Sequence, residues 1–460
     1  MNNNHAWSKS RYSVVNAKQG RLQKPVVIIL FGYSLILIPS TLILMTEFAS
    51  VTGLDWIDAL FTATSALTVT GLGVVDTGTH FSAVGQVWLM LLMQLGGLGQ
   101  MTLSVLILLT LGKSIGLKEQ AVVREELNQD FGTDIVSLIK VIIVFALTME
   151  LIGTVILSTV WVPEFGLAQG IYTAVFHSIS SFNNAGFSLF SASMSDYSHS
   201  PIVTLTISLL FIIGGLGFTV IIDLIKIKKN DHSKKRYTLS LHTKLVLIGS
   251  FVLLFGGAIA IGLLESNNSK TLGGHDLLST SLMSFFQSAT ARTAGFYSIN
   301  IIDMTHAGLL VMMVLMFIGA GSTSTGGGIK VSTFVVAIIA TRSFLKGSTR
   351  FPAFKRNIAP LVVLKALAII VVSFAILLTS AFALMLTEDA RFDVVLFEAI
   401  SAFSTVGLTA GLTENLSPTG KFIMIFLMII GRIGPITLAL LAASPNTSRI
   451  KYADEEVITG

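Results

Sequence analysis

The sequence predicts an all-α integral membrane protein. Four parallel repeats of the order M1–P–M2 (membrane helix, short pore helix, membrane helix) are expected to surround one pore with pseudo-fourfold symmetry. Three observations predict this: an apolar composition, basic residues confined to alternate segments, and a glycine motif that recurs four times. Of the 460 residues, 52% are hydrophobic and 12% are charged, about half the charged share of a soluble domain. With a mean hydropathy of +0.79, most of the surface must face lipid.

Eight apolar runs with almost no charge are predicted to be membrane helices: 25–46, 83–111, 136–161, 202–227, 243–264, 305–320, 359–386 and 420–443. A bilayer core of about 30 Å needs roughly 20 helical residues, so the run 305–320 is too short. The first run follows a polar segment and has no small-residue cleavage site, so we expect a retained membrane helix rather than a signal peptide. The chain has no cysteine, which excludes disulfides and thiolate metal sites.

The Lys and Arg side chains gather in four segments, with five in 1–24, four in 112–140, seven in 226–244 and six in 330–356. The loops between these segments hold only Lys270, Arg391 and Lys421. The positive-inside rule therefore predicts that all four basic segments, and both termini, are cytoplasmic. A third crossing in each repeat would put the basic linkers on alternating sides, so two crossings per repeat fit better. The same rule explains the net charge of +5 without nucleic acid.

Four short segments resemble one another: SALTVTGLG at 65–73, SSFNNAGFS at 180–188, ATARTAGFY at 289–297 and SAFSTVGLT at 401–409. They share a glycine at Gly71, Gly186, Gly295 and Gly407, and a phenylalanine ten residues earlier at Phe61, Phe176, Phe285 and Phe397. A second motif, called the echo motif below, follows each of these glycines: GGLG at 96–99, GGLG at 214–217, GAGS at 319–322 and GRIG at 431–434. Two markers in fixed order, four times over, indicate fourfold internal duplication.

The repeats and charge pattern predict these boundaries: tail 1–24, repeat one 25–113, linker 114–134, repeat two 135–229, linker 230–242, repeat three 243–346, linker 347–358, repeat four 359–445 and tail 446–460. Within each repeat, a short segment precedes the shared glycine, at about 55–68, 168–183, 277–291 and 391–403. These segments are too short to cross a bilayer and are predicted to be re-entrant pore helices.

The glycine loops are predicted to form a selectivity filter. Non-helical backbone at membrane depth must line water or be buried in protein, so four such loops belong around one axis. Rings of backbone carbonyls can replace the hydration shell of K⁺, and glycine permits the dihedral angles that this needs. The predicted filter residues are Thr68, Val69, Thr70 and Gly71; Asn183, Asn184, Ala185 and Gly186; Arg292, Thr293, Ala294 and Gly295; and Ser404, Thr405, Val406 and Gly407. One K⁺ site is expected at the carbonyls of Thr70, Ala185, Ala294 and Val406.

For an isolated glycine, close helix packing would be the better interpretation. The fourfold recurrence after a short helix outweighs it at the filter positions. For the GGLG-type echoes, packing between helices remains the preferred interpretation.

A break in the second helix of repeat three is predicted at GAGSTSTGGGIK, residues 319–330. Five glycines in twelve residues disfavour a continuous helix, since each costs about 1 kcal/mol relative to alanine, and a second piece over 329–345 would complete the span. The predicted gate comprises Gly319, Gly321, Ser322, Thr323, Ser324, Thr325, Gly326, Gly327, Gly328 and Arg432. A phosphate-binding loop is rejected because Gly327 and Gly328 stand where Lys and Ser/Thr would be required.

Two arginines lie at membrane depth, where a charge is costly. Arg432 would face the pore below the filter and oppose a waiting cation; the alternative is a structural salt bridge. Arg292 would pair with Glu398 behind the filter or face the outer mouth, and a packing ion pair is the alternative. His177, in the second pore helix, is expected to be satisfied packing rather than a ligand.

These motifs resemble the superfamily of Trk, Ktr and HKT potassium transporters over residues 25–445. Without the additional N-terminal helices of Trk-type subunits, the chain is most similar to the Ktr-type membrane subunit. The resemblance implies potassium uptake through the glycine loops, an intramembrane gating loop with a pore arginine, and a bacterial inner-membrane location. It also implies a homodimer, a cytosolic ring of nucleotide-binding regulatory subunits (KtrA-like, RCK type) and a frequent dependence on Na⁺, with no cofactor bound by this chain.

Two rival classes fit less well. A secondary transporter of another cation or small solute would commonly have inverted repeats, which the charge pattern opposes. An intramembrane enzyme would need a catalytic motif, and the sequence contains no HExxH or GxSxG and no cluster of His, Asp and Glu.

Overall fold

The computed structural model describes residues 23–99, 135–230 and 238–434. The predicted linker 114–134, the tail 446–460 and nearly all of the tail 1–24 lie outside these residues. Helices dominate the described part, in the order α2 (Gln23–Leu44), α3 (Trp56–Leu67), α4 (Thr77–His80), α5 (Ala83–Gly97), α8 (Ile135–Phe165), α9 (Leu167–Phe182), α10 (Pro201–Leu216), α11 (Phe218–Asn230), α12 (Leu241–Glu265), α13 (Leu277–Thr290), α14 (His306–Phe317), α15 (Val331–Leu345), α16 (Pro360–Thr387), α17 (Phe392–Ser404) and α18 (Pro418–Ile433). A short antiparallel hairpin, β1 (Phe351–Ala353) and β2 (Arg356–Ile358), joins α15 to α16.

Several helices are long and apolar enough to cross a bilayer. Within the described residues these are Ile139–Phe165, Leu241–Glu265 and Pro360–Thr387. A fourth candidate is the pair α10 and α11, which is bent by 94°. Shorter apolar helices occupy Phe31–Leu44, Ala83–Gly97, His306–Phe317 and Val331–Leu345. The ends of the predicted runs 83–111 and 420–443 lie outside the described residues.

The four short helices α3, α9, α13 and α17 begin and end within one residue of the predicted pore helices. Each packs against the long helix that precedes it, as α2 with α3, α8 with α9, α12 with α13 and α16 with α17. Phe61, Phe176 and Phe397 on three of these helices are fully buried. Ser, Thr and Asp side chains cap several helix starts, for example Asp276, which accepts a hydrogen bond from the backbone of Ser279 at the start of α13.

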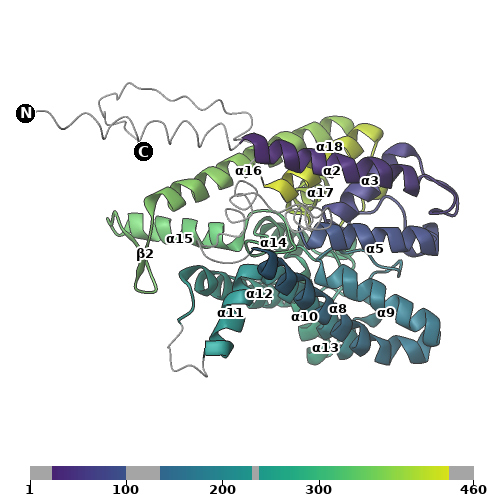
Figure 1. Cartoon of the computed structure of the whole chain (residues 1–460), viewed down its shortest axis with the longest axis horizontal. Helices are drawn as coiled ribbons and strands as arrows, with labels where there is room; N and C mark the ends of the chain where they lie inside the picture. Colours follow the sequence, from purple (N-terminus) through teal and green to yellow (C-terminus); the bar gives the residue numbers. More distant parts are fainter. Residues whose placement is uncertain (1–22, 100–134, 231–237, 435–460) are drawn as a thin grey trace, which may run out of the picture.

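Contacts between helices run around the molecule and return to the start. Helix α5 contacts α9, α10 contacts α13, α14 contacts α17, and α18 contacts α3. Figure 1 shows α18 and α17, at the yellow end of the chain, lying beside α2 and α3, at its purple end. The first and last quarters of the sequence are therefore neighbours. An ion pair of 2.5 Å between Lys421 on α18 and Asp58 on α3 joins them.

The break predicted in the second helix of the third repeat is present, and the second repeat has a break that was not predicted. Helix α10 bends by 94° into α11 at Gly217, whose φ is +98°. Gly99 and Gly434 follow the ends of α5 and α18 with φ values of +88° and +97°. All three are the last glycine of the echo motif, and only glycine adopts these angles without strain. The third repeat differs in having thirteen non-helical residues, 318–330, between α14 and α15.

The first glycine of the echo has the packing role expected of it. A Cβ added to Gly96, Gly214 or Gly431 would collide with a carbonyl oxygen at the end of a pore helix. Those oxygens belong to Leu67, Phe182 and Phe403, respectively. The absence of a side chain therefore lets each second helix lie directly against the end of a pore helix.

Candidate ion filter and gate

The four glycine loops share an unusual backbone. The residue two positions before each glycine is left-handed, with φ values of +50° at Val69, +57° at Asn184, +73° at Thr293 and +50° at Thr405. The glycines themselves have φ values of +91° at Gly71, +71° at Gly186, +82° at Gly295 and +93° at Gly407. A non-glycine residue with positive φ is uncommon. Its recurrence at the same place in four loops indicates a common local structure.

The loops meet in a closed cycle. Each glycine lies against the carbonyl oxygen of the residue that precedes the next glycine in the chain, and the last glycine lies against the first loop. The pairs, with the distance from a Cβ added at the glycine to that oxygen, are Gly71 and Ala185 (2.5 Å), Gly186 and Ala294 (3.0 Å), Gly295 and Val406 (2.7 Å), and Gly407 and Thr70 (a collision). The structure therefore brings together the four carbonyls that were predicted as ion ligands.

Hydrogen bonds to the pore helices hold the loops in shape. Three loops turn back in the same way, with Thr70 N donating to Ser65 O (2.8 Å), Ala185 N to Ser180 O (2.8 Å) and Val406 N to Ser401 O (2.9 Å). The third loop is one residue tighter, because Ala294 N donates to Thr290 O at 2.9 Å. In agreement with this shift, Phe286 is fully buried on α13, while the predicted marker Phe285 is only partly buried.

Two polar side chains on the pore helices brace the chain just after the filter. Each lies nine residues before its glycine. Glu398 accepts hydrogen bonds from the Thr409 hydroxyl (2.5 Å), Ala410 N (2.9 Å), Leu412 N (3.2 Å) and the Thr413 hydroxyl (2.7 Å). His177 bonds through Nδ1 to Thr173 O (2.8 Å) and through Nε2 to the Ser188 hydroxyl (3.1 Å). The expectation that His177 is satisfied packing is confirmed.

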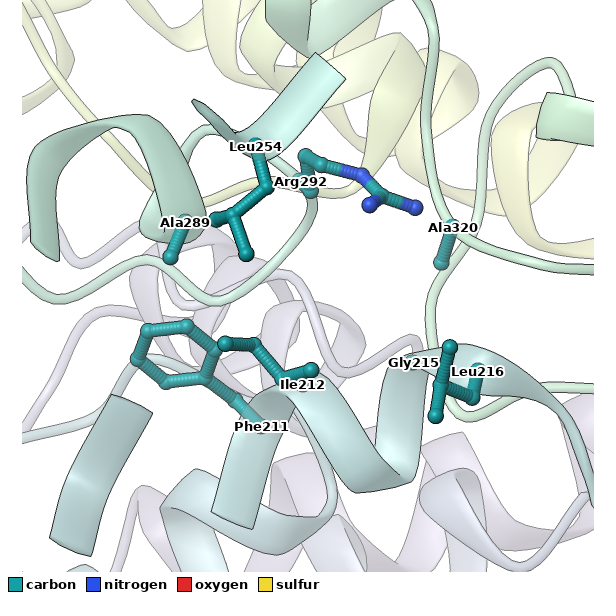
Figure 2. Close-up of a pocket in the computed structure, with 8 residues that line it drawn as sticks. All are labelled: Phe211, Ile212, Gly215, Leu216, Leu254, Ala289, Arg292 and Ala320. Carbon is teal, nitrogen blue, oxygen red and sulfur yellow. The ribbon is translucent and has the colours of Figure 1, made fainter. Parts of the chain in front are cut away.

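Of the alternatives considered for Arg292, the pair with Glu398 is not formed. Arg292 donates from Nη1 to Ser250 O (3.2 Å) and from Nη2 to the Ser250 hydroxyl (3.0 Å), both on α12. Figure 2 shows its side chain starting near Leu254 and its guanidinium pointing away from that residue, toward Ala320, at a small cavity that both residues line. The cavity has a volume of about 20 Å³, which is room for one water. The Glu398 carboxylate accepts hydrogen bonds from its own loop. The Arg292 side chain instead points toward helix α12.

The predicted gate segment lies against three of the filter loops. The Thr325 hydroxyl donates to Asn184 Oδ1 at 2.7 Å. A Cβ added to Gly326 would collide with the Thr293 hydroxyl, and one added to Gly327 would collide with that of Thr405. The glycines therefore let this segment lie directly beneath the filter side chains.

The same segment is anchored to the bend between α10 and α11. Gly321 N donates to Gly215 O at 2.8 Å, and Phe218 N donates to Thr323 O at 3.0 Å. The Thr323 hydroxyl also bonds to that of Thr219 at 3.0 Å. The remaining predicted gate residues lie in the same place: Ser322 bonds to Ser332 (2.8 Å), the Ser324 hydroxyl is buried, Gly319 packs near Gly327 O, and Gly328 packs against Ser404.

Arg432 lies where the gate segment meets the first and fourth repeats. Its guanidinium donates to the carbonyl oxygens of Thr325 and Gly96. Lys330, at the end of the segment, donates to Gly326 O at 2.6 Å. Sequence reasoning omitted Lys330 from the gate; a lysine at the end of a glycine-rich break in an apolar run was the signal that could have identified it. Among the described residues, no three His, Asp or Glu side chains gather as metal ligands.

Replacing Glu398 by leucine should destabilise the protein strongly. Four donors would lose a buried acceptor, and each unsatisfied group costs about 1–3 kcal/mol. We expect a loss of at least about 3 kcal/mol, measured as a lower thermal unfolding midpoint in detergent. Glu398→Gln, which keeps one acceptor oxygen, should lower the thermal unfolding midpoint by less. Asp393→Leu is the matched control, because Asp393 forms its ion pair with the exposed Arg391 and such pairs contribute little. Equal losses of stability for Glu398→Leu and Asp393→Leu would contradict the role of Glu398 in bracing the loop.

Comparisons with known proteins place the chain in one family. A family model described as TrkH, cation transport protein, matches residues 23–451. The Ktr system potassium uptake protein B of Vibrio alginolyticus is 54% identical, with 94% of both chains covered, and that of Bacillus subtilis is 45% identical, with 95% of this chain and 97% of the relative covered. The potassium/sodium uptake protein NtpJ of Enterococcus hirae is 39% identical over 94% and 95%.

The fold is shared with a solved structure. The crystal structure of the potassium transporter TrkH from Vibrio parahaemolyticus matches with a TM-score of 0.71 and 18% sequence identity. The match covers 91% of this chain and 84% of that one. At this identity the likeness concerns the fold. The resemblance found in the sequence motifs is confirmed.

Proposed function

This chain belongs to the TrkH family of cation transport proteins, and from that premise we propose that it takes up potassium ions across the membrane as the ion-translocating subunit of a Ktr-type system. Two of its relatives are named as potassium uptake proteins of such a system. The ion would pass through the filter formed by the four glycine loops.

One observation carries this proposal: the cycle in which each filter glycine lies against the carbonyl before the next. In this cycle the carbonyl oxygens of Thr70, Ala185, Ala294 and Val406 each lie beside a glycine of a neighbouring loop, which supports a shared ion site. A dehydrated K⁺ needs several oxygen ligands in place of water. Because only one glycine is common to the four loops, we propose one well-defined ion site rather than a long row of equal sites.

The architecture proposed is the fourfold one. The helix contacts pass from one predicted repeat to the next and from the last to the first. This supports pseudo-fourfold symmetry, with the repeat boundaries 25–113, 135–229, 243–346 and 359–445 and a cytoplasmic location for the linkers and both termini.

The segment 319–330 is proposed as the gate of this path. It lies against the side chains of three filter loops, and Arg432 ties it to the end of α5. The guanidinium would also repel a cation waiting below. The path would open when the segment withdraws from the filter.

The assembly proposed is a homodimer of this chain with a cytosolic, KtrA-like ring of nucleotide-binding subunits. The name Ktr system, carried by two relatives, supports a partner subunit. The basic segments 226–244 and 330–356 are the proposed contact region. Since another relative is named a potassium/sodium uptake protein, we also propose that Na⁺ takes part in transport.

The test is potassium-dependent growth and flux. Expression of the chain with its regulatory subunit should restore growth of a bacterium deficient in potassium uptake at low external K⁺. In proteoliposomes with equal Na⁺ concentrations on both sides, a K⁺ gradient alone should drive ⁸⁶Rb⁺ entry. If the correctly inserted protein required a second ion or solute gradient for any flux, a coupled secondary transporter would replace this proposal.

A further inference from the structure

A buried glutamate lies in the middle of helix α8 and has no part in the filter or gate described above. Glu150 is 5% exposed and belongs to the candidate membrane span Ile139–Phe165. Carboxyl groups inside membrane helices are costly and normally serve a function. The hydrogen bonds of Glu150 point to the function that this carboxyl group serves.

Glu150 is joined directly to the second filter loop. Asn183 Nδ2 donates to Glu150 Oε1 at 3.0 Å and to Gln94 Oε1, on α5, at 2.9 Å. Asn183 is fully buried and immediately precedes Asn184, the left-handed residue of that loop. The cluster therefore links helices of the first and second repeats to the backbone just before the carbonyl of Ala185.

We propose that Glu150 is a positioning residue for ion selectivity, which holds the second filter loop in its strained conformation through Asn183. The inference rests on the proposed function, since it concerns the same filter. Asn184 carries a left-handed backbone angle, which is uncommon for a residue other than glycine and is held in place by surrounding contacts. The hydrogen bonds of Asn183 supply such contacts immediately upstream.

The third repeat supports this assignment because it has an equivalent tether with different residues. Arg292 stands three positions before Gly295, as Asn183 does before Gly186. It is bonded to Ser250 on α12, so both loops are fastened to the first helix of their own repeat. In the first loop, by contrast, the Thr68 hydroxyl bonds to Thr64 O within its own pore helix (2.8 Å).

A leucine occupies the place in the third repeat that corresponds to Glu150. The Ser178 hydroxyl donates to Glu150 O at 2.6 Å, and the Ser288 hydroxyl donates to Leu254 O at 2.7 Å. The backbone contact between the membrane helix and the pore helix is thus the same with either side chain. Replacing Glu150 by leucine should therefore keep that contact and remove only the carboxylate.

Glu150→Leu is expected to raise the K⁺ concentration for half-maximal uptake, and to lower the preference for K⁺ over Na⁺, each by about tenfold. Glu150→Gln keeps an acceptor for Asn183 and should stay within about twofold of the parent in both quantities. Thr148→Ala is the matched control on α8, because its hydroxyl is exposed and bonds to Val144 O in the same helix. Uptake is measured in cells and in proteoliposomes at graded K⁺ and Na⁺.

A double substitution separates a tether from a general structural effect. If Glu150 acts through Asn183, the double variant Glu150→Leu with Asn183→Ala should have the same preference for K⁺ over Na⁺ as Asn183→Ala alone. Should Glu150→Leu not reach the membrane, Gln94→Leu removes the other side-chain acceptor of Asn183 and should likewise lower the preference for K⁺ over Na⁺; the remaining acceptor, Ile179 O, belongs to the pore helix itself. The inference would be overturned if the leucine variant, at Glu150 or at Gln94, kept the parental preference for K⁺ over Na⁺. Additive losses of this preference in the double variant of Glu150 and Asn183 would overturn it as well.

The outcome is distinguishable from a failure of the proposed function. If the parent chain shows no K⁺-selective uptake, the function itself fails, whatever the variants do. If the parent is selective and Glu150→Leu is equally selective, only the role of Glu150 is lost.

Discussion

Gly407→Ser should remove selective potassium uptake. The glycine has a φ of +93°, and a Cβ at this position would collide with the carbonyl oxygen of Thr70. The strained backbone would cost about 1–3 kcal/mol, and relief of the collision would displace one of the four proposed ion ligands. We expect the preference for K⁺ over Na⁺ to fall by about 100-fold. The same substitution at Gly71, Gly186 and Gly295 should act in the same way, because each of these glycines lies against a neighbouring carbonyl.

The measurement is growth at graded external K⁺ together with the K⁺ and Na⁺ dependence of uptake, at equal amounts of inserted protein. Gly256→Ser on α12 is the control, because none of the described atoms lies within 4 Å of the Cβ that it would add. If all four filter variants kept the parental K⁺ affinity and Na⁺ discrimination, the filter assignment would be wrong.

Replacing the gate arginine, Arg432, should raise K⁺ flux. Arg432→Ala removes the donors to the Thr325 and Gly96 carbonyls. Two hydrogen bonds from a charged group contribute on the order of 3 kcal/mol to holding the gate segment. The change also removes a positive charge from the path. We expect K⁺ flux to rise at least tenfold, measured as ⁸⁶Rb⁺ entry into proteoliposomes.

Arg432→Lys separates the two contributions. It keeps the charge, but a single ammonium cannot reproduce the planar fork that reaches two carbonyls. A rise in flux with lysine would assign the barrier mainly to the hydrogen bonds, while parental flux would assign it to the charge. Arg391→Ala, on the exposed outer surface, is the control. Unchanged or reduced flux for Arg432→Ala in properly inserted protein would contradict the barrier role.

Deleting residues 322–328 is expected to raise flux for the same reason. Ile318 pairs with Ile329 in parallel orientation, and parallel segments cannot be joined directly. A flexible glycine linker should therefore take the place of the deleted residues, so that α14 and α15 can keep their positions. Flux below that of the parent, in protein that inserts normally, would show that the segment supports conduction rather than blocks it.

The local features of this fold were predictable because they depend on local physical rules. The pore helices stood out as short amphipathic segments, and the filter glycines stood out because the conformation that they adopt excludes most other residues. The gate segment was visible because so many glycines cannot continue a helix. A short sequence window is enough for the pore helices and the gate segment, whereas the filter glycines were distinguished from packing glycines by their recurrence in four repeats.

The errors came where one sequence pattern serves two purposes. The echo GGLG was interpreted as packing, and its first glycine does pack; its last glycine also ends the helix, which only the backbone angle at Gly217 reveals. For Arg292, the sequence offered Glu398 as one candidate partner, but the direction of a side chain from a turn depends on three-dimensional contacts. Its partner, Ser250, is 42 residues away and carries no charge that would draw attention.

The ring closes through contacts between the two ends of the chain. Gly407 meets Thr70, Lys421 meets Asp58, and Arg432 meets Gly96, so each closing contact joins residues more than 300 positions apart. During synthesis, the partners in the final quarter enter the membrane long after the first quarter has been inserted. An unfinished chain therefore lacks one side of the conduction path. The proposed filter can therefore form only after the final quarter of the chain has been inserted.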